Sequence, residues 1–520
     1  MHAETPSEIE HRTSGGGQRS SWLLPSVCAG VALYLYVNLF VFPRIPILLT
    51  GDQLYFWMDG QRILHGELPY RDFFQFTPPG TDLLYFSVFK LLGPHVWVTN
   101  MVVLALGVAL CGVCLSIAMQ MMELDLALPA TILFLTLVYT KALNATHHWF
   151  SILAILFAVR ILLRERSRRR LLAAGGLLGL ACFFTQSHGV AALLAVTIWL
   201  GWQYSPERQN WLPFLMGGVL LFVGFAITLG VVESYFIATV GWKALWYFQV
   251  EYVRKYMVHG PETRFLGMPD WSGWRHFSSS AQYIFVYLLL PFAYAFSLQK
   301  CWKANSKAFS PEQRQKVMLV ALAGAVLLSE VMFSLNWLRI YAISMPGVIL
   351  ALWLVGQFRN ARPLLVRMVW IGILLIATIQ IFRAHHRPYA IMKLPAGWAA
   401  VDPGAYPKLH WIQEHTRPEE FFFQVVWPGV YLPLRLRNPV FEDAVGPGIA
   451  TRPADLQRSI AQLDTRQVRY ILWSQQLNPN GDLDLPPSSL SPLRSYLHAH
   501  YIKVMVFGDR DEIWERKTAN

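Results

Sequence analysis

Residues 95–120 read HVWVTNMVVLALGVALCGVCLSIAMQ, a run without a single Asp, Glu, Lys or Arg. A helix of about 20 such residues crosses the hydrocarbon core of a bilayer, which is roughly 30 Å thick. Comparable apolar runs recur from Trp22 to Phe382 in a chain of 520 residues that is 54% hydrophobic and only 15% charged. The sequence therefore predicts an α-helical polytopic membrane protein, because no ordinary soluble domain carries this composition.

The apolar runs predict eleven membrane spans. The spans cover residues 22–42, 95–120, 128–142, 149–163, 171–186, 188–203, 211–232, 281–299, 317–335, 340–357 and 366–382. Residues 1–21 are polar and rich in Gly and Ser, which predicts a disordered segment. Residues 22–382 then form one transmembrane domain.

Residues 383–520 are predicted to form a small α/β domain, because helix-like and strand-like patterns alternate along them. The expected helices cover residues 406–415 and 454–463, and the expected strands cover residues 421–427, 468–473 and 502–507.

Basic residues predict the orientation of the chain. Residues 160–170 hold six arginines, residues 300–316 five basic residues and residues 359–367 three arginines. Lys and Arg accumulate in cytoplasmic loops, so the N-terminus is predicted to be cytoplasmic and the C-terminal domain, after an odd number of spans, extracytoplasmic. The expected location is the inner (plasma) membrane. Because these loops account for much of the net charge of +12, no nucleic-acid partner is expected.

Two long outer loops are predicted, over residues 43–94 and 233–281. Residues 81–92 are apolar, but as a helix they span only about 18 Å, which is too short to cross. We expect them to form an interfacial helix within the first loop. The second loop is rich in Trp and Tyr, which is typical of the headgroup level of a membrane. All five cysteines lie in or beside apolar runs, so no disulfide framework is expected.

The first outer loop holds the most informative motifs, which are TGDQLY at 50–55, GELPYRDFF at 66–74 and TPPG at 77–80. Asp52 follows the first span by about ten positions, where a lipid headgroup and an aqueous acceptor meet. A carboxylate in that place can take the proton from an attacking hydroxyl group. A solvated loop aspartate is the alternative interpretation from composition alone.

Together, the early aspartate, the PYRDF segment, the PPG and a short apolar helix ending in Leu-Gly-Pro resemble the GT-C superfamily of polyprenyl-phosphate-sugar glycosyltransferases. The similar branch is that of protein O-mannosyltransferases and aminoarabinose transferases, and the resemblance extends over the whole chain in topology. It implies an inverting transferase that moves a hexosyl or pentosyl group from a polyprenyl-phosphate donor to a lipid, glycan or protein acceptor. It also implies that Asp52 is the catalytic base. Many members carry a second acid beside this residue, where this chain has Gln53.

Other carboxylates of the first loop are weaker candidates. Asp72 is a possible second acid, but its neighbour Arg71 favours a structural ion pair. Asp59 and Glu67 are expected on solvated faces of the interfacial helices.

The second outer turn contains the adjacent residues His147 and His148. Adjacent helical residues point about 100° apart, so the two rings cannot chelate one metal ion as an i, i+4 pair can. No metal and no cofactor other than the lipid-linked donor are expected. The two histidines either contact the substrate, or cap and pack the helix.

A departing polyprenyl phosphate needs a positive charge near the membrane surface. Arg339 and Tyr341 lie where relatives show a basic residue and a tyrosine, so they are expected to bind the phosphate of the lipid carrier. An arginine that reaches toward lipid headgroups is the alternative. Glu330 lies within an apolar run and is expected either to pair with an Arg or His of another helix or to contact the substrate. Glu251 and Arg254 are further possible substrate contacts.

Two other classes of function fit the composition. A transporter or flippase for lipid-linked saccharides would also be aromatic and basic, although such proteins usually show internal repeats and polar residues near the membrane midplane. A non-catalytic membrane protein of envelope assembly would not need Asp52.

Overall fold

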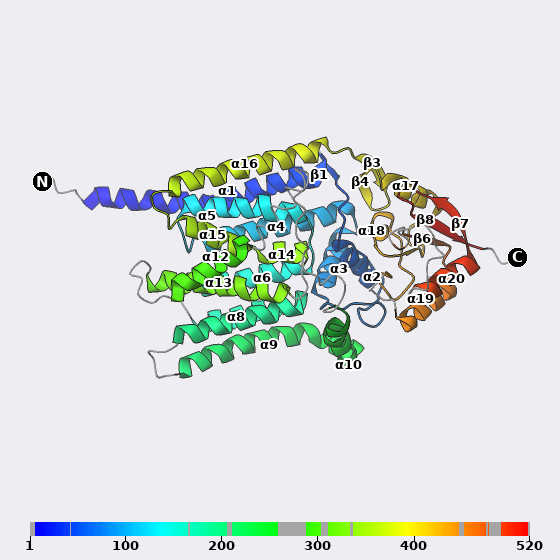
Figure 1. Cartoon of the computed structure of the whole chain (residues 1–520), viewed down its shortest axis with the longest axis horizontal. Helices are drawn as coiled ribbons and strands as arrows, with labels where there is room; N and C mark the ends of the chain where they lie inside the picture. Colours follow the sequence, from blue (N-terminus) through cyan, green and yellow to red (C-terminus); the bar gives the residue numbers. More distant parts are fainter. Residues whose placement is uncertain are drawn as a thin grey trace.

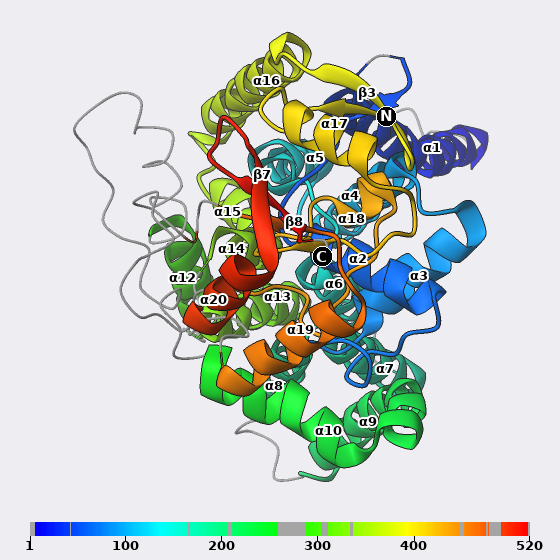
Figure 2. The same ribbon diagram turned by 90° about the vertical axis from the view of Figure 1, so that its right-hand side faces the viewer.

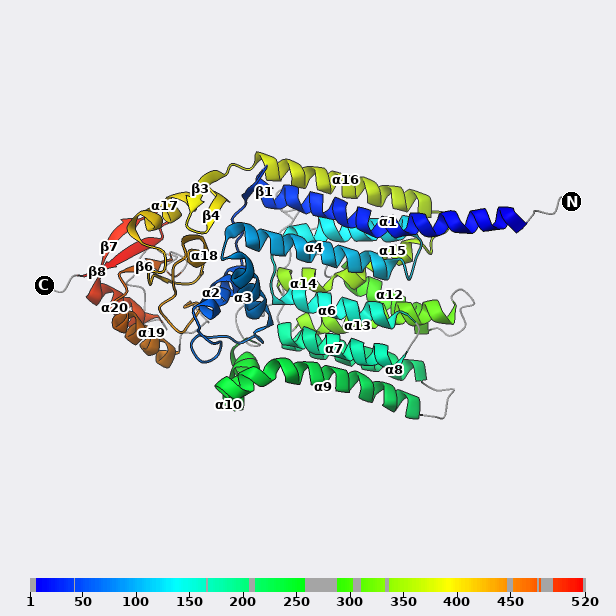
Figure 3. The same cartoon turned by 180° about the vertical axis from the view of Figure 1, so that it is seen from behind.

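The computed structural model describes residues 6–41, 43–164, 167–204, 211–257, 288–302, 310–332, 336–446, 452–474, 477 and 490–517. Long helices run side by side along the longest axis of the molecule (Figure 1). The N-terminus and the C-terminus lie at opposite ends of this axis, as the view from behind also shows (Figure 3). Helices α2 and α3 lie at one end of the bundle, between the bundle and the C-terminal strands.

The bundle consists of helices that occupy the described part of every predicted span. They are α1 (Pro6–Leu39), α4 (Val96–Ala118), α5 (Leu124–Leu133), α6 (His147–Leu162), α7 (Arg168–Phe184), α8 (Gln186–Tyr204), α9 (Leu212–Val240), α12 (Leu290–Trp302), α13 (Pro311–Val331), α14 (Trp337–Ile343), α15 (Met345–Val355) and α16 (Arg362–His386), with η1 (Phe134–Val138) and η2 (Tyr139–Ala142) continuing α5.

Among the described residues, five helical segments are long and apolar enough to cross a membrane. They are Trp22–Leu39, Val96–Ala118, Leu124–Ala142, Leu212–Val240 and Arg362–His386, and the bent pair α14 and α15 makes a sixth if it is one span. The other predicted spans coincide with helices that are shorter or more polar. The number of eleven spans therefore stays a prediction.

Two helices, α1 and α9, extend beyond the predicted spans. Helix α1 begins at Pro6, although composition predicted disorder over residues 1–21. A helix that extends from an existing span needs no new nucleation, so polar residues can continue it. Helix α9 likewise continues to Val240, past the predicted start of the second outer loop. Residues 258–281 of that loop lie outside the described part of the chain.

Helices α7 and α9 approach each other closely through glycines. A Cβ atom on Gly175 would lie 2.0 Å from the carbonyl oxygen of Leu221, and one on Gly224 would lie 2.2 Å from that of Leu172. Small residues allow two membrane helices to pack backbone against backbone. This contact fixes α7 and with it the sharp turn at Thr185 that leads into α8.

The predicted span at residues 340–357 is broken. Helices α14 and α15 meet at an angle of 52°. Pro346 has no N–H group, so it cannot bond the carbonyl of Ala342 four residues earlier, and its ring clashes with the continuing helix. Helix α14, which carries Arg339, lies at the end of the bundle at which α2 and α3 lie (Figure 1).

The first outer loop is ordered around two helices, α2 (Gln53–Leu64) and α3 (Gly80–Leu92), after the short pair β1 (Phe40–Val41) and β2 (Ile45–Pro46). Helix α3 covers the residues predicted to form an interfacial helix. It packs tightly on α2, because a Cβ atom on Gly60 would lie 2.9 Å from that of Tyr85. In the second loop, α10 (Trp242–Trp246) and η3 (Tyr247–Met257) follow α9.

The C-terminal residues form a small α/β unit around a four-stranded sheet of order β5-β6-β8-β7, in which β5 and β6 are parallel. Its elements are β3 (Ala390–Leu394), β4 (Gly397–Val401), α17 (Tyr406–His415), β5 (Phe423–Gln424), α18 (Tyr431–Leu434), α19 (Pro453–Thr465), β6 (Tyr470–Trp473), α20 (Ser491–His500), β7 (Tyr501–Val506) and β8 (Glu512–Arg516).

Successive β6 residues point to opposite faces of the sheet. Leu472 belongs to a core that also contains Met58 of α2 and Val96 of α4, and Trp473 belongs to the core under α19 and α20. The C-terminal unit therefore shares one of its cores with the first outer loop. It covers the end of the bundle at which α2 lies (Figure 2).

Candidate functional site

Asp52 lies directly before α2. Gly51 has φ of +90°, which glycine adopts without steric cost, and this turn leads the chain into the helix. The Asp52 side chain is partly exposed and makes no capping hydrogen bond to α2. The helix end therefore does not depend on this carboxylate.

Gln53 is buried and fastens α2 to the second outer turn. Its Oε1 accepts a hydrogen bond from the backbone N–H of Ala145 at 3.3 Å. One turn further along α2, the Phe56 ring lies 5.5 Å from the His147 ring, measured between centroids. Asp52 is thus held beside the turn that carries the two predicted histidines.

Three histidines, His147, His148 and His188, meet at this end of the bundle and are called the histidine group below. The ring centroids of His147 and His148 are 3.8 Å apart, and those of His148 and His188 are 5.2 Å apart. The Thr185 hydroxyl lies 2.8 Å from His147 Nδ1, and the Ser151 hydroxyl lies 2.8 Å from His188 Nδ1. Neither hydroxyl residue was predicted from the sequence, although Thr185 stands out as a polar residue near the end of the span predicted at residues 171–186.

Glu330 and Arg339 join the histidine group from two further helices. Glu330 Oε2 lies 3.4 Å from His188 Nε2, so the acid of the span predicted at residues 317–335 has a histidine partner on another helix, one of its two expected roles. Arg339 lies in the first turn of α14, which the side chain of Asn336 caps by accepting from the Arg339 N–H at 2.9 Å. Its guanidinium lies within electrostatic reach of all three histidines.

Three other candidates lie apart from this group. Tyr341 is 6% exposed and packs in the bundle core, with its ring 6.1 Å from that of Trp337. Glu251 and Arg254 lie on η3, and Arg254 is exposed. Within the described residues, neither makes a hydrogen bond or an ion pair with the histidine group.

Asp72 is held by its neighbours. Arg71 Nη2 lies 2.7 Å from Asp72 Oδ2, and the same oxygen accepts from the backbone N–H of Leu68 at 2.8 Å. The hydrogen bond from Arg71 lowers the pKa of the Asp72 carboxyl. This geometry fits the structural ion pair that sequence analysis favoured.

Asp59 and Glu67 were expected on solvated faces, and the structure corrects this. Asp59 is 0% exposed, and Glu67 Oε2 lies 2.7 Å from Nε of the buried Arg62. Helix α2 lies between α3 and the C-terminal unit, so it has no broad face toward solvent. Spacing along a single helix does not reveal that both sides are covered.

Asp59 shares its buried environment with Asp82 of α3. Gln75 Nε2 donates to Asp82 Oδ2 at 2.8 Å and lies 3.4 Å from Asp59 Oδ2. Burial raises the pKa of Asp82 to about 7. Burial, together with the Asp443 and Asp82 carboxyls, raises the pKa of Asp59 well above its usual value. Both carboxyls therefore hold a proton up to a higher pH than an exposed aspartate does.

The Asp82→Asn variant is expected to change how stability depends on pH. An unfolded aspartate has a pKa of about 3.9, so between that value and about 7 the folded protein holds a proton that the unfolded chain releases. The stability that Asp82 contributes is therefore lost as the pH rises toward and through about 7. Asn is neutral at every pH, so the melting temperature of the variant should fall less than that of the wild type between pH 5 and pH 8.

Asp72→Asn is the control for this measurement. The pKa of Asp72 is lowered, so its carboxyl is ionised in both states throughout the range from pH 5 to pH 8. This variant should follow the pH trend of the wild type. An equal fall of the melting temperature in Asp82→Asn and wild type between pH 5 and pH 8 would contradict the protonation of Asp82.

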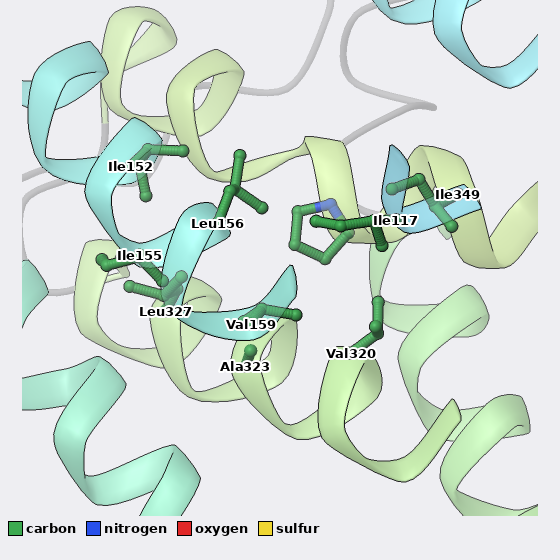
Figure 4. Close-up of a pocket in the computed structure, with 10 residues that line it drawn as sticks. Ile117, Ile152, Ile155, Leu156, Val159, Val320, Ala323, Leu327 and Ile349 are labelled. Carbon is green, nitrogen blue, oxygen red and sulfur yellow. The ribbon is translucent and has the colours of Figure 1, made fainter. Parts of the chain in front are cut away.

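The apolar interior of the bundle offers no room for a substrate at the pocket drawn in Figure 4. Its lining side chains, among them Ile152, Leu156 and Ile349, are all apolar, and its volume is about 10 Å³. That is close to the space of a single water molecule. It is a small packing defect between α4, α6, α13 and α15. Within the described residues, no three His, Cys, Asp or Glu side chains are arranged to hold a metal ion.

Comparison with known proteins identifies the fold. No protein-family model and no curated protein matches the chain in sequence. The structure is similar to that of ArnT from Cupriavidus metallidurans in the apo state, with a TM-score of 0.59 at 13% identity over 96% of this chain and 98% of that chain. The same ArnT bound to undecaprenyl phosphate gives a TM-score of 0.54 at 13% identity, over 95% and 98% of the two chains. The chain therefore has the fold of the GT-C membrane glycosyltransferases.

Proposed function

We propose that this membrane protein transfers a sugar from a polyprenyl-phosphate donor to an acceptor hydroxyl on the extracytoplasmic face of the inner membrane. The observation that carries the proposal is that Asp52 precedes helix α2, whose residues Gln53 and Phe56 contact the turn that carries His147, within electrostatic reach of Arg339. The likeness to ArnT, including the form bound to undecaprenyl phosphate, supports this use of the fold.

Side chains of this protein can carry out both the proton transfer and the stabilisation of the leaving phosphate. Asp52 takes the proton of the acceptor hydroxyl, and the oxygen attacks the anomeric carbon of the donor. The bond between that carbon and the phosphate oxygen breaks with inversion, and its electron pair leaves with the polyprenyl phosphate. Arg339 donates to the phosphate as negative charge develops on it. No metal is needed, because the positive charge comes from this guanidinium.

The proposal includes the orientation of the chain in the membrane. The N-terminus is cytoplasmic, and the C-terminal unit is extracytoplasmic. The two ends of the chain lie at opposite ends of the bundle (Figure 1), and the arginine-rich sequence of residues 160–170 is assigned to the cytoplasmic side.

The proposal is tested by transfer of radiolabelled sugar from polyprenyl-phosphate donors to envelope fractions, with purified protein in nanodiscs and with EDTA present. Wild-type protein should transfer label. Arg339→Gln should lower the turnover rate by about 10²-fold, because it removes one charged hydrogen-bond donor to the negative charge that develops on the departing phosphate.

Arg359→Gln is the matched control, because Arg359 is an exposed arginine between α15 and α16, away from the histidine group. It should behave as wild type. Absence of transfer with a complete set of donors would contradict the proposal. Movement of intact donor from one leaflet to the other, in closed vesicles that contain the protein, would favour a flippase instead.

A further inference from the structure

A pocket of about 400 Å³ opens in the C-terminal unit, where the parallel strands β5 and β6 end. Pockets for small ligands usually measure about 300–1,000 Å³. In sheets with parallel strands they lie at the carboxyl ends of those strands. The polar and aromatic side chains that line this pocket are Lys408, Gln424, Trp427, Ser474, Asp509 and Asp511.

The rim of the pocket touches α2 one turn from Asp52. The Tyr55 hydroxyl donates to the carbonyl oxygen of Val426 at 2.9 Å, and the ring centroids of Tyr55 and Trp427 are 5.8 Å apart. Residues three positions apart on a helix are neighbours on its surface, so Tyr55 and Asp52 lie side by side. The rim of the pocket is therefore joined through Tyr55 to the helical turn that follows the proposed base.

The loop after β5 is held in a strained shape that presents Trp427. Val426 has φ of +81°, which a β-branched residue rarely adopts. Such strain persists only where the surrounding structure enforces it, and it gathers at functional sites. Here the Tyr55 hydroxyl holds the Val426 carbonyl, and Gln424 Oε1 accepts from the Val430 N–H at 3.0 Å. Trp427 is left 38% exposed at the rim.

The charges of the lining favour a neutral ligand. Lys408 Nζ lies 2.7 Å from Asp509 Oδ2 and also contacts Asp511. Two carboxylates against one ammonium leave a net negative charge, which repels phosphate and other anionic groups. Carboxylate, amide and hydroxyl groups beside an exposed indole ring suit a molecule with many hydroxyls and apolar C–H faces, which is a saccharide.

We infer that this pocket binds a neutral saccharide segment of the acceptor and directs one of its hydroxyls toward Asp52. Transfer to that hydroxyl rests on the proposed function, whereas binding of the saccharide does not. The acceptor is thereby assigned to the glycan class, or to a glycan part of a larger molecule.

Saturation-transfer NMR on the full-length protein in nanodiscs tests the inference. The probes are disaccharides of the gluco, galacto, manno and N-acetylglucosamine series, each beside its phosphorylated form, without sugar-based detergent. At least one neutral disaccharide should bind, and its phosphorylated form should bind more weakly. Trp427→Ala should raise its Kd by about tenfold, and Trp427→Phe should restore part of the affinity.

Trp398→Ala is the matched control, because Trp398 is another exposed tryptophan of the same unit and lies on β4. It should bind as wild type does. Absence of binding to every probe, or equal binding by Trp427→Ala, would overturn the inference even if sugar transfer occurs. Binding that depends on Trp427 in a protein without transferase activity would leave the pocket standing and refute the proposed function.

Discussion

Asp52→Asn is expected to lower sugar transfer by about 10²–10⁴-fold, the usual contribution of a positioned general base. Asn has nearly the same shape as Asp but cannot take a proton from the acceptor hydroxyl. The fold should survive, because the Asp52 side chain makes no capping bond to α2 and Gln53 holds that helix to Ala145. Single-turnover rates at saturating donor separate the chemical step from binding, so the rate should fall while the Kd of the donor is unchanged.

Asp72→Asn is the matched control for this variant, since it removes the other carboxylate that sequence analysis considered as a catalytic acid. Asp72 is engaged with Arg71 and with the backbone of Leu68, so its loss should leave transfer within a factor of a few of wild type. Full activity of Asp52→Asn would remove Asp52 as the base. Equal losses in both variants would point to damage of the loop instead of loss of a proton acceptor.

Sequence periodicity predicted the helices well where tertiary contacts agree with it. The helix expected at residues 406–415 is α17, Tyr406–His415, and the short apolar helix of the first loop is α3. The strand expected over residues 421–427 shrinks to β5, two residues long. The physical reason is the positive φ of Val426, which ends the extended conformation and which no local propensity indicates.

Several members of the candidate site were predicted one by one, but Ser151, Thr185 and the arrangement of the site were not. Asp52, His147 and Arg339 each follow from a position near a predicted membrane surface. The pairing of Glu330 with His188 requires knowing that α8 and α13 are neighbours. The burial of Asp59 requires knowing that α3 and the C-terminal unit both cover α2. The sequence of one helix shows how its residues are spaced, but it does not show which residues of other helices they contact.

Arg62 is the residue that joins these parts, and its contacts explain why the first loop and the C-terminal unit form one body. It is 4% exposed, and it lies 2.7 Å from Glu67 and 3.4 Å from Asp443. Its Nη1 also donates to the carbonyl of Val440 at 3.0 Å, and its guanidinium lies 4.8 Å from the centroid of the Phe73 ring. One cation thus compensates two carboxylates that come from separate parts of the chain.

Arg62→Met is therefore expected to lower the free energy of unfolding by about 3–5 kcal/mol, because it leaves the buried Asp443 carboxylate without its cation. Thermal unfolding in nanodiscs measures the loss, and Arg71→Met, at a largely exposed pair, should leave the free energy of unfolding nearly unchanged.

The deficit of Arg62→Met should also depend on pH in a defined direction. Burial already raises the pKa of Asp443, and Arg62 opposes that rise, so removing the arginine raises the pKa further. The folded variant then takes up a proton on Asp443 at a higher pH than the wild type does, and a protonated carboxyl no longer needs a cation. The deficit should therefore be smaller at pH 5 than at pH 8, and the double variant Arg62→Met/Asp443→Asn should recover part of it at pH 8. A deficit that is independent of pH, with no recovery in the double variant, would assign the role of Arg62 to packing against Phe73 instead of to charge.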